Sequence, residues 1–207
     1  MEKIKLDIPT LILGAGISGS GKTVLMTEVA RNVLNSFYIN KDTINDSFLL
    51  TVNPSFNGNQ VYNLDGQPIP RNSDYYGRNV KFQSYHCMME LAKDNLVLGK
   101  HPIVEGNYTR EIQNGYIDEI LNPFFSSVPH RTKLIFCYAD EENIRKRLQD
   151  RNSLKDAEKL RSEESWQAFL KSQPILPVEL ERYDHVKVDT TEPIEMNIEE
   201  ILDYLRR

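Results

Sequence analysis

Glycines, a lysine and a threonine stand at a spacing that suits the binding of a phosphate group. Residues 16–23 read Gly-Ile-Ser-Gly-Ser-Gly-Lys-Thr, which fits the pattern G-x-x-x-x-G-K-[ST]. Small residues let the backbone wrap round a phosphate, so that successive N–H groups point at its oxygens. Lys22 would add a positive charge for the outer phosphates, and the Thr23 hydroxyl would bind Mg²⁺. The predicted nucleotide-binding residues are Gly16, Ser18, Gly19, Ser20, Gly21, Lys22 and Thr23.

The same stretch also satisfies a second pattern. Residues 14–19 fit G-x-G-x-x-G, which binds dinucleotides, and Asp42 lies roughly where that pattern places an acid. The second pattern does not account for Lys22 and Thr23, which come directly after the last glycine. A loop for a nucleoside triphosphate is therefore the favoured interpretation, and dinucleotide binding is the alternative.

Two carboxylates follow predicted strands. Asp42 comes after an apolar stretch at 37–39 and could accept the proton of an acceptor hydroxyl. The alternative is that Asp42 caps a helix at 43–50. Glu105 ends an apolar stretch at 102–105, where it could hold a metal through its water shell or lie exposed in solvent. We predict that Asp42 is catalytic and that Glu105 belongs to the metal site.

A basic cluster lies at 145–151. Arg147 and Arg151 are four residues apart, so a helix would place them on one face. Guanidinium groups stabilise the charge that develops on a transferring phosphoryl group. The alternative is a solvated charged face, in which these side chains pair with neighbouring acids. The predicted catalytic residues are Lys22, Asp42, Arg147 and Arg151.

Strands and helices are predicted to alternate along the chain. Apolar patterning predicts strands at 10–14, 37–39, 102–105, 133–138 and 186–188. It predicts helices at 21–35, 43–50, 74–98, 115–125, 164–170 and 193–205, and one through Leu148 that Asp140 caps. Such alternation is typical of an α/β domain with a mainly parallel sheet, in which ligands bind beyond the carboxyl ends of the strands. This rule gathers four loops at one edge, namely residues 14–23, 40–42, 105–110 and 138–140.

Composition limits the classes of function. The 207 residues carry a net charge of −5, whereas proteins that grip nucleic acid usually have a basic surplus. No apolar run is long enough to span a bilayer, and the first nine residues lack the apolar segment of a signal peptide. Cys87 and Cys137 are expected to be reduced thiols. We predict a single cytoplasmic domain over 1–207, with no membrane partner, that acts on a small molecule or nucleotide.

One segment breaks the alternating pattern. Residues 51–73 are rich in Asn, Gly, Pro and Asp, and they are long for a connection between two elements. Loops of this length are usually functional or mobile. The segment is predicted to be an insertion on the substrate side, and a disordered surface loop is the alternative.

Together these motifs resemble those of a known family. The residues that carry the resemblance are 16–23, 38–42, 91–105, 147–151 and 188–190. The chain looks like the small P-loop kinases and AAA_33-type ATPases, in the group that includes shikimate and gluconate kinases, zeta-type toxins and bacteriophage polynucleotide kinase. The resemblance implies a three-layer α/β/α P-loop NTPase fold similar to that of nucleoside kinases, with a five-stranded, mainly parallel sheet. It also implies a helical lid around 149–163.

The resemblance implies roles for single residues as well. Asp42 is similar to the acid that activates the acceptor, Arg147 would lie near the adenine or the phosphates, and Arg151 would serve the lid. Relatives often have Asp where this chain has Glu105, and residues 51–73 match no familiar segment.

These observations predict a phosphotransferase that depends on ATP and Mg²⁺. It would move the γ-phosphate to a hydroxyl of a small molecule or nucleotide-like acceptor. One alternative is a nucleotide-binding regulatory ATPase that acts through a protein partner. Another is a toxin or a polynucleotide 5′-hydroxyl kinase, against which the acidic balance argues. The sequence leaves open the acceptor, the preference for ATP over GTP and the oligomeric state.

Overall fold

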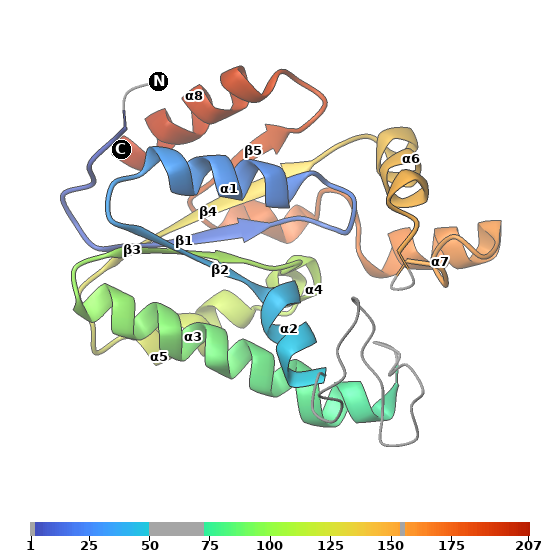
Figure 1. Ribbon diagram of the computed structural model, residues 1–207, viewed down its shortest axis with the longest axis horizontal. Helices are drawn as coiled ribbons and strands as arrows, with labels where there is room; N and C mark the ends of the chain where they lie inside the picture. Colours follow the sequence, from blue (N-terminus) through green and yellow to red (C-terminus); the bar gives the residue numbers. More distant parts are fainter. Residues whose placement is uncertain (1–2, 50–72, 154–155) are drawn as a thin grey trace, which may run out of the picture. The chain divides into compact units, whose positions relative to one another are not determined.

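The computed structural model describes residues 3–49, 73–153 and 156–207 (Figure 1). The chain divides into two compact units, one formed by Met1–Ile39 with Ala92–Arg207 and the other by Asn40–Leu91. The predicted insertion at 51–73 lies almost wholly outside the described residues. That the chain forms one domain with a substrate-side insertion stays a prediction.

The first unit is built on a five-stranded sheet. The strands are β1 (Thr10–Ala15), β2 (Ser36–Asn40), β3 (His101–Glu105), β4 (Arg131–Tyr138) and β5 (His185–Asp189). Their order is β2-β3-β1-β4-β5, and β1 runs parallel to both β3 and β4. β4 also runs parallel to β5. The prediction of a mainly parallel, five-stranded sheet is therefore confirmed, and the strand that leads into the phosphate loop stands at its centre.

Helical segments connect the strands. In chain order they are α1 (Lys22–Asn32), α2 (Lys41–Leu49), η1 (Tyr76–Lys81), α3 (Phe82–Val97), α4 (Thr109–Gln113), η2 (Ile117–Leu121), α5 (Asn122–Phe125), α6 (Glu141–Arg151), α7 (Glu163–Ser172), η3 (Val178–Arg182) and α8 (Ile194–Arg206). The Asp140 carboxylate accepts from the Asn143 N–H at 2.8 Å, which confirms the predicted cap of α6. In the described part of the chain, no helix is long and apolar enough to cross a membrane.

Apolar side chains bury the sheet between two helical layers. Figure 1 shows α1 and α8 on one side of the sheet and α5 on the other. Met26 and Val29 of α1 pack with Ile201 and Leu205 of α8 in one buried cluster that also contains strand residues. Burial of apolar surface on this scale is the main favourable contribution to folding. The predicted three-layer α/β/α arrangement is confirmed.

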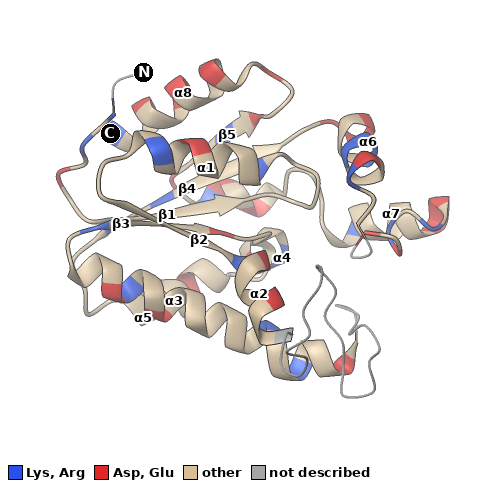
Figure 2. Ribbon diagram, viewed as in Figure 1, with Lys and Arg blue, Asp and Glu red and all other residues tan. Residues whose placement is uncertain are grey.

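The charged residues are distributed unevenly over the helices. Figure 2 shows acidic residues along α8, whereas both signs of charge are interspersed on α6 and α7. The acidic residues of α8 are Glu195, Glu199, Glu200 and Asp203. This distribution agrees with the acidic balance of the sequence.

The helix predicted at 21–35 ends early, at Asn32. Val33 is extended and forms a parallel bridge with Ile4, and the Leu34 N–H donates to the Ile4 carbonyl at 2.8 Å. Pairing with the N-terminal segment thus takes the place of another helical turn. The sequence pattern around α1 could not show this, because Ile4 is distant in the sequence.

Two further differences concern short or irregular helices. The helix predicted at 74–98 has a π-helical stretch, η1, before α3 begins. The loop predicted at 105–110 overlaps the start of α4, which is only five residues long. A helix of that length is too short to show apolar periodicity, and the left-handed backbone of Tyr108 (φ 54°) sets its start.

The second unit consists of α2, η1 and most of α3. Phe48 packs against the buried side chains of Tyr76 and Val80. Asn45 Nδ2 donates to the Tyr76 hydroxyl at 3.1 Å. These contacts join α2 to η1, so the unit has a small core of its own.

Candidate functional site

Glycine conformations shape the phosphate loop between β1 and α1. Gly16, Gly19 and Gly21 have φ values of 141°, 85° and 80°, which only glycine adopts readily. A Cβ on Gly16 would stand 2.3 Å from the carbonyl oxygen of Cys137, and one on Gly21 would stand 2.9 Å from Thr190. The backbone therefore approaches its neighbours too closely for any side chain at these positions.

The loop rests on an apolar base. Ile17 is buried in a cluster with Ile144 and Leu148 of α6 and Trp166 of α7. The Gly16 N–H donates to the Asn107 carbonyl at 3.0 Å, which ties the loop to the segment after β3. The base holds the loop backbone in place before any ligand binds.

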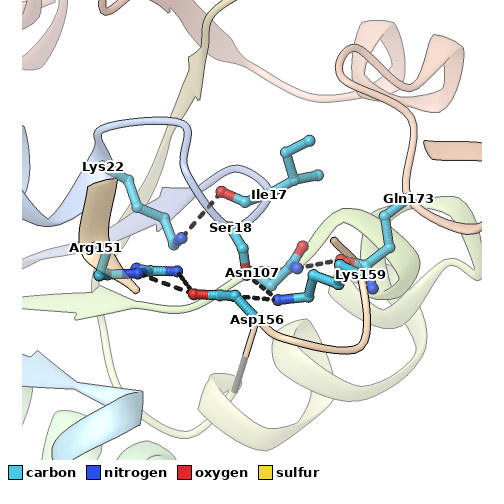
Figure 3. A network of polar contacts seen from close by, with 8 residues as sticks. All are labelled: Ile17, Ser18, Lys22, Asn107, Arg151, Asp156, Lys159 and Gln173. Carbon is cyan, nitrogen blue, oxygen red and sulfur yellow. Dashed lines mark hydrogen bonds and ion pairs between the residues drawn. The ribbon is translucent and has the colours of Figure 1, made fainter. Parts of the chain in front are cut away.

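Two polar side chains of the loop fit a nucleotide. Lys22 Nζ donates to the Ile17 carbonyl at 3.2 Å, so its ammonium group lies over the loop (Figure 3). Ser20 is fully buried, and its hydroxyl has no hydrogen-bond partner among the described residues. The loop thus combines a positive charge, a polar atom without a partner and a glycine backbone, which together suit a bound phosphate chain.

The predicted metal-site residues meet. Glu105 stands opposite Gly14 in the pairing of β3 with β1, and Thr23 lies in the first turn of α1. The Thr23 hydroxyl donates to Glu105 Oε1 at 2.6 Å, and the Tyr38 hydroxyl donates to Glu105 Oε2. Glu105 is 5% exposed, so the alternative of a solvated strand end is wrong. A hydroxyl and a carboxylate are the oxygen ligands that suit Mg²⁺.

The site does not offer a complete protein cage for a metal. The described residues contain no group of three or more His, Cys, Asp and Glu side chains that could hold an ion. Burial raises the pKa of the nearby Cys137 thiol to about 12, so this side chain remains a neutral thiol beneath the loop. A magnesium ion here would take its remaining ligands from phosphate oxygens and water, as is usual for nucleotide sites.

Arg147 lies against the loop backbone. Its guanidinium donates to the Gly19 carbonyl at 3.3 Å, to Thr190 Oγ1 at 2.7 Å and to the Thr190 carbonyl at 2.8 Å. The side chain therefore joins α6, the phosphate loop and the segment after β5. A role for Arg147 in stabilising transferred charge stays a prediction.

Arg151 belongs to a second polar network, drawn in Figure 3. It donates to Asp156, which also accepts from Lys159 at 2.6 Å. Lys159 in turn donates to Ser18 of the phosphate loop at 3.1 Å. The network links the end of α6 to the loop through residues that follow α6. That residues 149–163 form a lid over the site stays a prediction.

Asp42 belongs to the other unit. It lies in the first turn of α2, and Asn40 Oδ1 accepts from the backbone N–H groups of Asp42 (2.8 Å) and Thr43 (3.3 Å). The residue that caps α2 is therefore Asn40, and the alternative that Asp42 is the cap is wrong. That Asp42 faces the phosphate loop stays a prediction.

Three residues at the site were missed from the sequence. Tyr38 lies in a strand, where it reads as an ordinary β-forming residue. Asp156 lies in a segment with so many charged residues that no single carboxylate stands out. Thr190 belongs to a motif of only three residues, 188–190, which is too short to indicate a role. The contacts of Tyr38 and Thr190 depend on which segments the sheet brings together.

A family model agrees with this arrangement. The AAA_33 model, described as an AAA domain, matches residues 11–174, which include the loop and both polar networks except Thr190. The chain belongs to the AAA_33 family. This family consists of P-loop proteins that bind ATP, so the AAA_33 domain described here is a nucleotide-binding domain. No curated protein matches the chain in sequence.

Solved structures share the fold. A candidate kinase from Chloroflexus aurantiacus has a TM-score of 0.69 and 17% identity, with 96% of this chain and 99% of that chain covered. A gluconokinase from Sinorhizobium meliloti has a TM-score of 0.56 and 18% identity, with 96% and 92% covered. Kti12 from Chaetomium thermophilum, solved with ADP-AlF3, has a TM-score of 0.54 and 12% identity, with 95% and 99% covered. At these identities the likeness establishes a kinase-like P-loop NTPase fold.

Proposed function

We propose that this AAA_33 protein is an ATP-dependent phosphotransferase that moves the γ-phosphate to a hydroxyl of a small-molecule or nucleotide-like acceptor. The observation that carries the proposal is the hydrogen bond between Thr23 and Glu105 (2.6 Å) beside a glycine loop that Lys22 overlies. The hydroxyl, carboxylate and ammonium are the groups that phosphoryl transfer needs around a magnesium-bound triphosphate. The kinases among the structures with this fold support the same reading.

The residues divide the chemistry among them. Lys22 and the loop N–H groups bind the phosphates, while Thr23 and Glu105 hold the magnesium ion, which would neutralise phosphate charge when bound. Asp42 accepts the proton of the acceptor hydroxyl as its oxygen attacks the γ-phosphorus and ADP leaves. Arg147 and Arg151 stabilise the negative charge of the transferred group.

The first test is ATP consumption by the purified protein with Mg²⁺. It is measured alone and with pools of hydroxyl-bearing metabolites, nucleosides and short 5′-hydroxyl oligonucleotides. We expect one metabolite or nucleoside pool to accelerate ADP release and to yield a product heavier by one phosphoryl group. Stimulation by the oligonucleotides alone would instead identify a polynucleotide kinase.

Two substitutions test the assigned roles. We expect Lys22→Ala to abolish ATP use, and Asp42→Asn to leave ATP binding intact while slowing transfer by at least about 10²-fold. Lys146→Ala, at an exposed position on α6, is the control that should retain activity. Binding is measured by calorimetry and transfer by product mass. Unchanged transfer by Asp42→Asn would show that Asp42 is not the base.

The alternative is a nucleotide-dependent regulator that acts through a protein partner. The fold matches that of Kti12, whose name does not describe a kinase, about as well as that of the gluconokinase, so the fold does not separate the two functions. A regulator would bind ATP and turn it over slowly, with no acceleration by any pool. The rate with the complete set of pools therefore separates the two functions.

A further inference from the structure

Asp156 is a buried carboxylate between two cations. Its side chain is 1% exposed, whereas the side chains of Arg151 and Lys159 are 41% and 22% exposed. Arg151 Nε donates to Oδ2 at 2.9 Å, and Lys159 Nζ donates to Oδ1 at 2.6 Å. Each carboxylate oxygen thus holds a different cation, and the three side chains together keep one net positive charge.

This cluster contacts the phosphate loop directly through Lys159, and it is joined to the loop indirectly through α6. Lys159 Nζ also donates to Ser18 Oγ at 3.1 Å (Figure 3). Arg151 ends α6, the helix whose Ile144 and Leu148 pack against Ile17. The position of both cations beside the loop therefore depends on the carboxylate that joins them.

We propose that Asp156 is a positioning residue for nucleotide binding, which holds Arg151 and Lys159 at the phosphate loop. The inference rests on the proposed function only in requiring that the loop binds a nucleotide. The opposite possibility is that Asp156 competes with phosphates for the two cations. Its burial argues against competition, because a displaced carboxylate would lose both partners while having little access to water.

The test is a double-mutant cycle on ADP affinity. Calorimetry of the full chain with ADP and Mg²⁺ compares wild type, Asp156→Asn, Lys159→Gln and the double variant. We expect each single substitution to weaken binding by about tenfold or more. The loss in the double variant should be smaller than the sum of the two single losses, because only the part that acts through Arg151 remains. Asp156→Glu should restore part of the affinity. Asp184→Asn, which breaks the 2.7 Å pair with Lys133 elsewhere, controls for the general loss of an ion pair.

Several results would overturn the proposal. Unchanged or tighter ADP binding by Asp156→Asn would contradict positioning, and tighter binding would establish competition. Additive losses in the double variant would show that Asp156 does not act through Lys159, which contradicts the proposal. If Asp156→Asn fails to fold, wild-type affinity in Lys159→Gln still refutes the proposal. A wild-type protein that does not bind ADP would refute the proposed function itself.

Discussion

Both oxygens of the Glu105 carboxylate are used within the protein. Oε1 accepts from Thr23, and Oε2 accepts from Tyr38. A carboxylate held on both sides keeps one orientation, which a metal site needs. Tyr38 therefore belongs to the site although it would not itself touch the ion.

We expect Tyr38→Phe to raise the Mg²⁺ concentration for half-maximal ADP binding by about tenfold, because loss of an outer partner loosens the ligand. ADP affinity without Mg²⁺ should be unchanged. Tyr183→Phe is the matched control, since the Tyr183 hydroxyl donates to another carboxylate, Asp118, at 3.0 Å. The same magnesium dependence in the two variants would show that Tyr38 does not contribute to the metal site.

The element that shapes the site is the loop between β1 and α1, and its glycines can be tested singly. We expect Gly16→Ala to destabilise the protein by about 2 kcal/mol or more and to weaken ADP binding, because its Cβ would stand 2.3 Å from a backbone oxygen. Gly77→Ala is the control. No heavy atom lies within 4 Å of its added Cβ, so it should be neutral or stabilising by about 0.5 kcal/mol.

Urea unfolding measures both glycine variants. The denaturation midpoint should fall for Gly16→Ala and stay or rise for Gly77→Ala. The same midpoint in both variants would mean that the close approach to Cys137 carries no cost.

The sequence predicted where most helices and strands lie, but it could not predict all the contacts between them. The strand positions followed from apolar runs, and the meeting of Thr23 with Glu105 followed from the rule that strand ends share one edge. The contact of Tyr38 with Glu105 could not be predicted, because it joins segments that only the folded sheet brings together. Asp156 contacts Arg151 and Lys159, which are near it in the sequence, but other carboxylates of the same charged segment were equally plausible partners. The order β2-β3-β1-β4-β5 is likewise a matter of non-local pairing.

The whole molecule should lose stability in mild acid through His101. This buried side chain accepts from the Thr10 N–H through Nδ1 at 3.2 Å. Burial, reinforced by the charge of Arg131, lowers the pKa of His101 below its usual 6.5. The unfolded chain then binds the proton more readily, so stability is full above about pH 6.5 and falls as the pH drops below it.

His101→Asn tests this pH dependence. The urea midpoint of the wild type should fall between about pH 7.5 and 5.5, and the fall should be smaller in the variant. His86→Asn, at an exposed position, is the control that should keep the wild-type profile. The same fall in wild type and His101→Asn would assign the acid sensitivity to other groups.

The central place of β1 has a consequence for synthesis of the chain. β1 pairs Ile12 with Ile103 of β3 and with Lys133 of β4, partners that are about 90 and 120 residues later in the chain. During translation, the phosphate loop therefore emerges from the ribosome well before the two strands that flank β1. Until β4 has emerged, Ile12 and Leu13 remain without their final neighbours, so these apolar side chains are open to aggregation while about 120 further residues are made.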